Sequence, residues 1–291
     1  DLFIALTGDS TDGHRFLDQA FAQGAAGAIV SSDTPQPHVR VADTFAALND
    51  LGRAARARMS GTVIGVTGSV GKTSAKEALF AALDRSLTGA VHRSVKSYNN
   101  HTGVPLSLAR MPRDTKVGVF EMGMNHAGEL SQLTRLVRPH IAIVTAIAPA
   151  HTEFFADESA IADAKGEIFQ GLEASDGSPG GIAIVPYDSP HRDRLMAAAA
   201  PYAARTVTFG LTKGADVYAV EAMRLPSGGS FVTAKVGARE LSFTLSQPGM
   251  HWVSNALAVL AAVDAAGADL ARAGLALAEM GGLVGRGRRR S

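Results

Sequence analysis

The stretch VIGVTGSVGKTSAKEALFAAL, residues 63–83, decides the fold that the sequence predicts. Its first four residues form an apolar run typical of a buried strand, and residues 74–83 have the composition of a helix. The turn between them contains two glycines, which let the backbone approach a polyanion, and the helix N-terminus that follows favours negative charge. A strand, a tight turn and a helix in this order predict a phosphate-binding loop.

The turn also carries the side chains that a nucleotide needs. Lys72 supplies a charge for the β- and γ-phosphate oxygens, and Thr73 supplies a hydroxyl for magnesium. The common P-loop pattern has a glycine five positions before Gly71, where this chain has Val66, so the match is to a shorter variant, TGxxGKT. An ordinary left-handed turn with a surface lysine is the alternative. The predicted nucleotide-binding residues are Thr67, Gly68, Ser69, Val70, Gly71, Lys72, Thr73 and Ser74.

Length and composition narrow the class of protein. A chain of 291 residues suggests two domains, and an apolar share of 46% is enough for buried cores. The net charge of +1 indicates neither a nucleic-acid partner nor an anionic membrane. The sequence contains no cysteine, which excludes a disulfide scaffold and thiolate metal sites. No apolar stretch approaches the ~20 residues of a membrane helix and no signal peptide is recognisable, so we expect a cytoplasmic protein.

Alternating strands and helices predict an α/β fold with two units. Residues 1–59 predict a small α/β unit near the lower size limit for independent folding. Residues 60–291 predict a P-loop-type, mostly parallel sheet with helices on both faces, whose ligands collect at the carboxyl ends of the strands. Between residues 207 and 245, short alternating runs predict appended antiparallel strands. The other expected elements are strands at 2–6, 28–30, 39–41, 63–66, 117–120, 141–145 and 182–185 and helices at 14–23, 44–59, 74–83, 129–137, 159–172, 254–266 and 270–280.

Glu121 directly follows the predicted strand 117–120, in the segment EMGMNHAGEL. A carboxylate at the end of a neighbouring strand is where a P-loop protein holds magnesium opposite the Thr73 hydroxyl. A solvated glutamate is the alternative. Asn125 and His126 come next in a glycine-flanked loop, where they either contact phosphate or substrate or only form a turn.

His151 follows the strand at 141–145, and Lys165 lies in the next predicted helix, in the segment DAKGEIF. If both face the same cleft as Glu121 and its metal ion, a protonated lysine ~4 Å from a unit positive charge costs about 4 kcal/mol at an effective dielectric near 20, and a divalent cation doubles that cost. Carbamylation by carbon dioxide would turn this cation into a carboxylate, which a hard cation prefers. A surface lysine on an amphipathic helix is the alternative.

Two polar segments supply further candidates, whose local sequence also suits simpler roles. Residues 97–105, SYNNHTGVP, contain Asn99, Asn100 and Thr102, and asparagines next to glycine and proline are common turn formers. Asn255 follows PGMHWVS and either caps the next helix or reads an adenine edge. The arginine run at 286–290 invites a nucleic-acid interpretation, although a short terminal cluster is more often a solvated end.

Taken together, the motifs resemble those of the Mur ligase family, the ATP-dependent ligases of bacterial peptidoglycan synthesis. They follow the family's order over nearly the whole chain, which is far more specific than the P-loop alone. Within the family they are most similar to the ligase that adds D-alanyl-D-alanine to UDP-N-acetylmuramoyl-tripeptide. The matching segments are DLFIALTGDSTDGHRF, VTGSVGKTSAKE, SYNNHTGVPLSL, VFEMGMNHAGEL, IVTAIAPAHTEFF, IADAKGEIFQGL and PGMHWVSNALA.

The resemblance implies ATP and two magnesium ions as cofactors. Thr73 and Glu121 would hold one magnesium ion. His151 and Lys165, a lysine often carbamylated in the family, would belong to the second magnesium site and act in catalysis together with Lys72.

The resemblance also assigns the remaining candidates. Asn255 would lie beside the adenine and Arg286 near the nucleotide, whereas Trp252 stands where the family commonly has an asparagine. Asp12, Gly13 and His14 would lie near the uridine end of the substrate. The other expected substrate residues are Asn99, Asn100, Thr102, Asn125 and His126.

In the family's domain plan, residues 1–59 would be a remnant of the UDP-substrate domain and residues 60–291 the central ATP-binding domain. The chain starts after the place of the family's aspartate and arginine motif for the uridine nucleotide, and the family's third, Rossmann-like domain is not found in the sequence. We therefore expect a chain that is truncated at both ends and binds nucleotide without full activity. We also expect a monomer. The reaction would activate the tripeptide carboxylate as an acyl phosphate for attack by the amine. The alternatives are a sister ligase of the MurE or folylpolyglutamate synthase type and a P-loop phosphotransferase.

Overall fold

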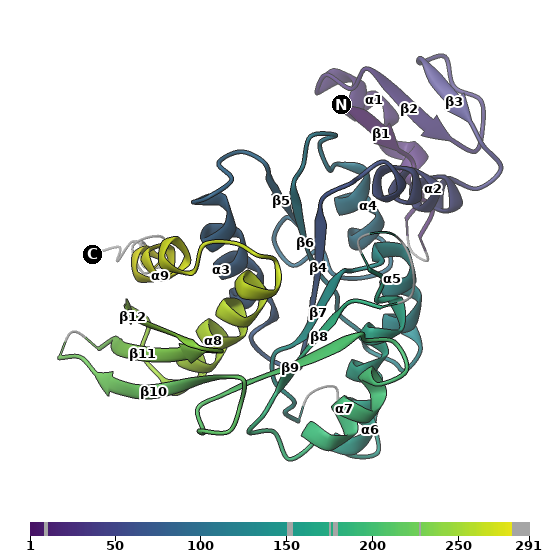
Figure 1. The fold of residues 1–291 in the computed structure, drawn as a ribbon. Helices are drawn as coiled ribbons and strands as arrows, with labels where there is room; N and C mark the ends of the chain where they lie inside the picture. Colours follow the sequence, from purple (N-terminus) through teal and green to yellow (C-terminus); the bar gives the residue numbers. More distant parts are fainter. Residues whose placement is uncertain (9–10, 150–153, 175, 177–179, 227, 281–291) are drawn as a thin grey trace, which may run out of the picture.

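A computed structural model of the chain describes residues 1–8, 11–149, 154–174, 176, 180–226 and 228–280. The strands of this part of the chain form two sheets (Figure 1). One has three strands in the order β1-β2-β3, and the other has nine in the order β12-β11-β10-β9-β8-β7-β4-β6-β5. The predicted α/β fold with a small first unit is confirmed.

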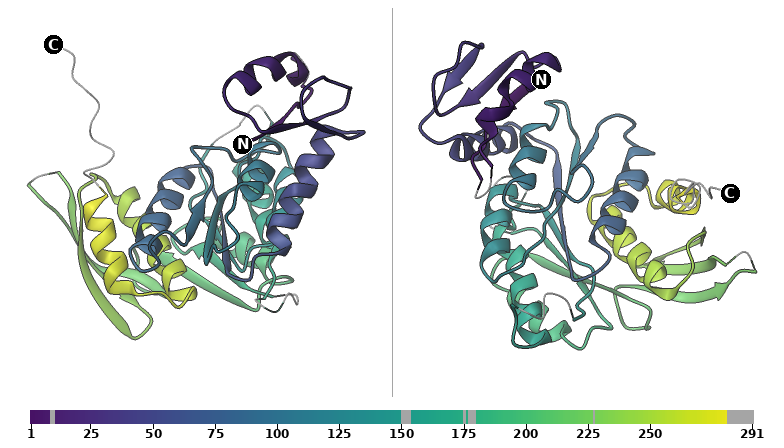
Figure 2. Two further views of the ribbon diagram at one scale, coloured as in Figure 1. Left: turned by 90° about the horizontal axis from the view of Figure 1, so that it is seen from above. Right: turned by 180° about the vertical axis from the view of Figure 1, so that it is seen from behind.

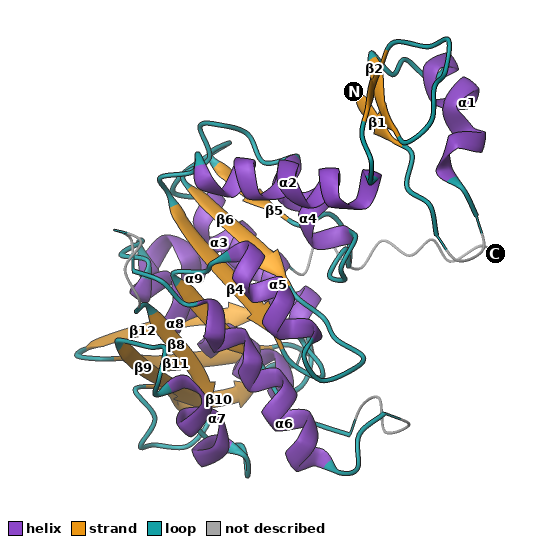
Figure 3. Ribbon diagram, turned by 90° about the vertical axis from the view of Figure 1, so that its right-hand side faces the viewer, coloured by secondary structure: helices purple, strands orange, loops and turns teal. Residues whose placement is uncertain are grey.

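The small sheet contains β1 (Leu2–Ile4), β2 (Gly27–Val30) and β3 (His38–Arg40), which are all parallel. One helix, α1 (Leu17–Ala22), packs on it through an apolar core that includes Ala28. The helix expected at 14–23 begins instead as a 3-10 turn, Gly13–Phe16. This unit projects at one corner of the molecule (Figures 1 and 3).

Helix α2 (Thr44–Ala57) follows the small sheet and packs against α4 (Gly103–Ala109) and α5 (Glu129–Val137). Its side chain Arg56 is only 3% exposed and donates to the Val137 carbonyl at 2.8 Å and to Glu173 at 2.7 Å. Because α2 is bonded in this way to the end of α5, it is anchored on the larger unit. The domain boundary at residue 59 stays a prediction.

The larger sheet is parallel from β5, at one edge, to β9. These strands lie between two helix layers, so their sequences are largely continuous apolar runs. Successive side chains point to opposite faces of the sheet: Val63 packs in one apolar core and Ile64 in the other. The parallel strands are β5 (Val91–Arg93), β6 (Val117–Glu121), β4 (Thr62–Thr67), β7 (Ile141–Val144), β8 (Ile182–Pro186) and β9 (Arg205–Gly210).

Helices cover both faces of this sheet (Figure 2). One face carries α3 (Lys72–Asp84), α8 (Met250–Ala265) and α9 (Leu270–Glu279). The other carries α4, α5, α6 (Glu158–Gly166), the 3-10 helix η2 (Glu167–Gly171) and α7 (Arg192–Ala199). Among the described residues, no helix is both long and apolar enough to cross a membrane.

The last three strands pair antiparallel with one another, as predicted: β10 (Val217–Arg224), β11 (Ser230–Val236) and β12 (Arg239–Leu245). At its other edge β10 pairs in parallel with β9. The prediction of antiparallel strands from residue 207 onward is wrong for β9, which is parallel to β8. The reason is α7, which the sequence pattern did not reveal. A helix between two strands makes a crossover connection, and a crossover places the second strand parallel to the first.

Candidate nucleotide and metal site

The phosphate-binding loop predicted at Thr67 to Ser74 comprises the last residue of β4, a turn at 68–71 and the first residues of α3, and it lies at the carboxyl end of β4. Gly68 and Gly71 have φ angles of 148° and 85°, which side chains rarely tolerate. A Cβ atom at Gly68 would collide with the Thr145 hydroxyl, and one at Gly71 would lie 2.8 Å from Asn255 Oδ1. Both positions therefore require glycine, because their φ angles are positive and because neighbouring side chains leave no room for a Cβ atom.

The end of β7 holds this loop in shape. The Thr145 hydroxyl donates to the Val70 carbonyl at 2.6 Å and also lies 3.2 Å from the Thr67 carbonyl. The Ser69 amide donates to the Ala146 carbonyl at 2.7 Å. In contrast, the buried hydroxyls of Thr67 and Ser69 have no hydrogen-bond partner among the described residues. The backbone is fixed while polar groups remain free for a ligand.

Thr73 and Glu121 meet beside the loop. The Thr73 hydroxyl donates to the Glu121 carboxylate, with distances of 2.9 Å and 3.1 Å to its two oxygens. The Asn99 amide donates to the same carboxylate at 2.8 Å. Glu121 is only 1% exposed, so the alternative of a solvated glutamate at a strand end is wrong. Three sequence motifs thus converge on one buried carboxylate.

Lys72 lies on the loop itself. Its ammonium donates to the Gly68 carbonyl at 2.7 Å and to the Ser69 carbonyl at 3.3 Å. Burial lowers the pKa of Lys72, and the negative charge of Glu121 partly opposes that shift. The side chain is thus partly desolvated and close to the place where phosphate oxygens would bind.

Lys165 lies in the last turn of α6 and is fully buried, so the alternative of a surface lysine is wrong. Its Nζ atom has no hydrogen-bond partner among the described residues. Burial, and next the positive charge of Lys72, lower the pKa of Lys165 to about 7. The amine is thus largely unprotonated in mildly alkaline solution. His151, its expected partner, lies outside the described residues.

Asn125 and His126 lie in the loop before α5, where both bond to Glu129. The backbone N–H of Asn125 donates to Glu129 at 2.7 Å, and His126 Nδ1 lies 3.0 Å from the same carboxylate. Asn100 accepts from the backbone N–H groups of Thr102 at 3.2 Å and Gly103 at 2.9 Å, which is turn chemistry at the start of α4. A pocket between these loops is lined by Asn99, Asn100, His101, Gly123, Met124, Asn125, Glu129, Gln132 and Leu133.

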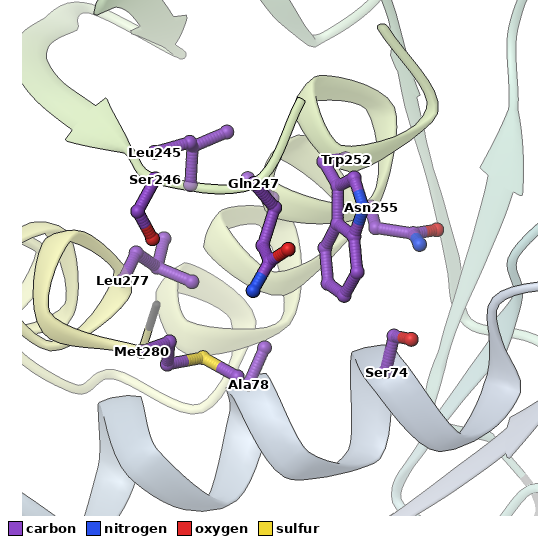
Figure 4. A pocket seen from close by; sticks show the side chains of 10 residues that line it. Ser74, Ala78, Leu245, Ser246, Gln247, Trp252, Asn255, Leu277 and Met280 are labelled. Carbon is purple, nitrogen blue, oxygen red and sulfur yellow. The ribbon is translucent and has the colours of Figure 1, made fainter. Parts of the chain in front are cut away.

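Asn255 lies in the second turn of α8, because this helix begins at Met250 rather than at residue 254. The alternative of a helix cap is therefore wrong. Its amide instead faces Gly71, and it borders an apolar pocket enclosed by α3, α8 and α9 (Figure 4). The lining residues are Ser74, Ala78, Leu245, Ser246, Gln247, Trp252, Asn255, Ala256, Leu277 and Met280.

Asp12, Gly13 and His14 are not part of this cluster, because they belong to the projecting first unit. Asp12 accepts from the His14 N–H at 3.0 Å and lies 2.6 Å from His14 Nδ1, while His14 Nε2 accepts from the Ser31 N–H at 2.9 Å. Both ring nitrogens of His14 are thus engaged within the chain. Arg286 lies outside the described residues.

Sequence reasoning missed Lys76, Ser94 and Thr145. Lys76 Nζ lies 3.6 Å from Glu121, and the Ser94 hydroxyl accepts from the Glu121 N–H at 3.0 Å. Lys76 could have been found, because it lies three positions after Thr73 and so on the same side of the helix. The other two residues depend on how distant strands pair, for which the local sequence holds no signal.

A glycine-containing loop at the carboxyl edge of a mostly parallel sheet, with a hydroxyl and a buried carboxylate beside it, defines a P-loop nucleotide-binding domain. Residues 66–263 match the family model described as the Mur ligase middle domain. The chain belongs to the Mur ligase family, which confirms the family resemblance of its motifs.

Known ligases are similar to nearly the whole chain. The UDP-N-acetylmuramoyl-tripeptide--D-alanyl-D-alanine ligase of Bacillus subtilis (strain 168) is 35% identical over 266 residues, covering 90% of this chain and 55% of that protein. A crystal structure of MurF from Acinetobacter baumannii matches with a TM-score of 0.83 and 32% identity, over 96% of this chain and 60% of that chain. MurF from Thermotoga maritima in complex with ADP has a TM-score of 0.79 and 27% identity, covering 96% and 62%. The chain thus spans little more than half the length of these relatives.

Proposed function

We propose that the chain forms the nucleotide- and metal-binding part of an ATP-dependent amide ligase that joins D-alanyl-D-alanine to UDP-N-acetylmuramoyl-tripeptide in peptidoglycan synthesis. The observation that carries this proposal is the contact of the Thr73 hydroxyl with Glu121, 2.9 Å apart, beside a loop of the P-loop type. The name of the Bacillus subtilis relative states the same reaction. The cytoplasm is the proposed compartment, and a monomer the proposed state.

The residues of the loop fit the phosphates of ATP. The unpartnered Ser69 hydroxyl and the N-terminal N–H groups of α3 are free donors, and Lys72 adds a positive charge. We place the adenine against the apolar surface beside Asn255, whose side-chain amide would read its polar edge. The ADP in the Thermotoga maritima structure supports a nucleotide as the ligand of this fold.

The residues beside the loop fit magnesium. Thr73 and Glu121 offer a hydroxyl and a carboxylate oxygen, which are the ligands that this ion prefers, with phosphate oxygens completing its shell. In the described part of the chain, no group of three or more His, Cys, Asp or Glu side chains could hold a metal. We therefore propose a magnesium ion shared with the nucleotide. Lys165, once carbamylated, and His151 would hold the second ion.

When ATP is bound, its γ-phosphoryl group would pass to the substrate carboxylate with ADP as the leaving group, and the amine of D-alanyl-D-alanine would then displace phosphate from the acyl phosphate. Because the first of these steps brings two anions together, the charge of Lys72 lowers its barrier. The polar pocket next to Glu121 would hold the substrate carboxylate, and its asparagine amides, those of Asn99 and Asn125 among them, would orient that group. Asp12, Gly13 and His14 would lie at the uridine end, where their mutual bonds keep the unit in shape.

Substitution of Lys72 by alanine in the complete enzyme tests the function. We expect the loss of ATP-dependent amide formation, because the charge on the phosphates disappears, and activity within tenfold of wild type would refute the role. Product analysis separates an amide from the phosphate ester of a phosphotransferase. A ligation assay that compares D-alanyl-D-alanine with single amino acids as the amine substrate distinguishes the proposed ligase from its sister ligases. Calorimetry of the 291 residues with ATP and magnesium, beside a ligation assay, tests binding without turnover.

A further inference from the structure

Lys76 is a buried cation that the P-loop pattern and the proposed chemistry leave without a role. It lies on α3, one turn after Thr73, and its side chain is completely buried. Lysine is almost never fully buried unless its charge is paired, because the ammonium group loses its hydration. The partners of Lys76 therefore indicate what holds it there.

The Lys76 ammonium joins three segments of the chain. It donates a hydrogen bond to the Lys96 carbonyl, lies 3.6 Å from the Glu121 carboxylate and lies 3.2 Å from the carboxylate of Glu77 on its own helix. The first of these partners belongs to the loop after β5, and the second ends β6. One ammonium group thus links the P-loop helix, the end of a strand and a loop.

The loop from residue 94 to residue 99 wraps around Glu121. The Ser94 hydroxyl accepts from the Glu121 N–H at 3.0 Å, and the Asn99 amide donates to the Glu121 carboxylate at 2.8 Å. Between them Lys96 has a φ of 51°, a left-handed conformation that is uncommon for residues other than glycine. The carbonyl that Lys76 binds belongs to this residue, so the bond stabilises the turn that brings Asn99 to the carboxylate.

We propose that Lys76 is a positioning residue of the magnesium site. It holds the Glu121 carboxylate and the Lys96 carbonyl together, so that Thr73, Glu121 and Asn99 are already assembled when the metal arrives. Lys76 acts through Glu121, because its own positive charge keeps it from coordinating a cation. This inference rests on the proposed function, since it assumes that Thr73 and Glu121 bind magnesium.

Calorimetry of ADP binding, with magnesium and with a chelator, tests the inference on the 291-residue chain. Magnesium should tighten ADP binding in the wild type. In Lys76→Met we expect this gain to fall at least tenfold, while affinity in the chelator stays within twofold because the loop is untouched. Lys76→Gln keeps an N–H for the Lys96 carbonyl without the charge, and it replaces the methionine variant in the test if that variant does not fold. In Lys76→Gln the gain in ADP affinity from magnesium should fall at least threefold.

The matched control is Lys116→Met, the same substitution at an exposed lysine outside this cluster. Its magnesium-dependent gain in ADP affinity should equal that of the wild type. Hydrogen exchange without metal gives a second readout: amides between 94 and 99 should exchange at least tenfold faster in Lys76→Met and no faster in Lys116→Met. Unchanged exchange in this loop in Lys76→Met would contradict the inference.

The outcomes separate this inference from the proposed function. If magnesium has no effect on ADP binding in the wild type, the metal site itself is refuted and the role of Lys76 with it. If Glu121→Gln abolishes the magnesium effect while Lys76→Met and Lys76→Gln retain it in full, only the positioning role is overturned.

Discussion

Replacing Lys165 by methionine should stabilise the protein at neutral pH. The methionine fills nearly the same volume, whereas the native ammonium is fully buried and has no hydrogen-bond partner among the described residues. Burial and the charge of Lys72 lower the pKa of this lysine from 10.5 to about 7. The protonated amine is thus better solvated in the unfolded chain than in the native state.

The sign of the pH dependence follows from linkage. Between the native and the unfolded pKa values the unfolded chain binds more protons, so the free energy of unfolding of the wild type rises with pH, by about 1.4 kcal/mol per unit. The destabilisation of the native state by Lys165 is fully present below pH 7, and it disappears above pH 10.5, the pKa of this lysine in the unfolded chain. Between pH 7.5 and 9.5 the wild type should therefore gain roughly 2.5 kcal/mol relative to Lys165→Met.

Urea denaturation of both proteins at several pH values, in buffers free of carbon dioxide, measures this difference. Subtracting the two curves removes the titration of all other groups, and Lys116→Met, at an exposed lysine, is the matched control. The reasoning is refuted if the stability difference between wild type and Lys165→Met stays constant across this range. Added bicarbonate should reduce the difference, if the unprotonated amine forms a carbamate.

Three further substitutions test other parts of the structure. Gly71→Ala places a Cβ at a φ of 85° and 2.8 Å from Asn255, so calorimetry should show ADP binding at least tenfold weaker. Arg56→Met leaves the Glu173 carboxylate, 16% exposed, without its buried partner, and urea denaturation should show a loss of about 3 kcal/mol; wild-type stability would contradict the pairing. Ala78→Leu adds bulk at a buried position beside the apolar pocket and should weaken ADP binding about tenfold, and ADP-free thermal unfolding measures the overpacking separately; undiminished affinity would place the adenine elsewhere.

The sequence predicts those parts of the fold that local chemistry controls. The P-loop follows from the glycines and from the order of strand, turn and helix, and the structure places α3 at Lys72–Asp84 where residues 74–83 were expected. The contact of Glu121 with Thr73 also follows, because the carboxyl ends of parallel strands meet at one edge of the sheet. Each prediction needed only neighbouring residues and one general rule of sheet geometry.

Other features depend on packing between distant segments. The burial of Lys76 and Lys165 is such a feature, because it arises only from segments distant in the sequence that pack over their helices. Asn255 lies beside Gly71 only because α8 packs close to the P-loop. Since α8 begins at Met250, Asn255 lies inside the helix and lines the pocket, whereas the sequence also allowed it to cap the helix. Such relations between segments leave no periodic signal in either segment alone.

The continuity of the nine-stranded sheet has a mechanical consequence. The two walls of the apolar pocket, on α3 and α8, rest on the same face of that sheet and share one apolar core with it. No hinge therefore separates the wall that carries Ser74 from the wall that carries Trp252. If the base and the phosphates bind where we propose, the distance between their two positions is set by this shared scaffold.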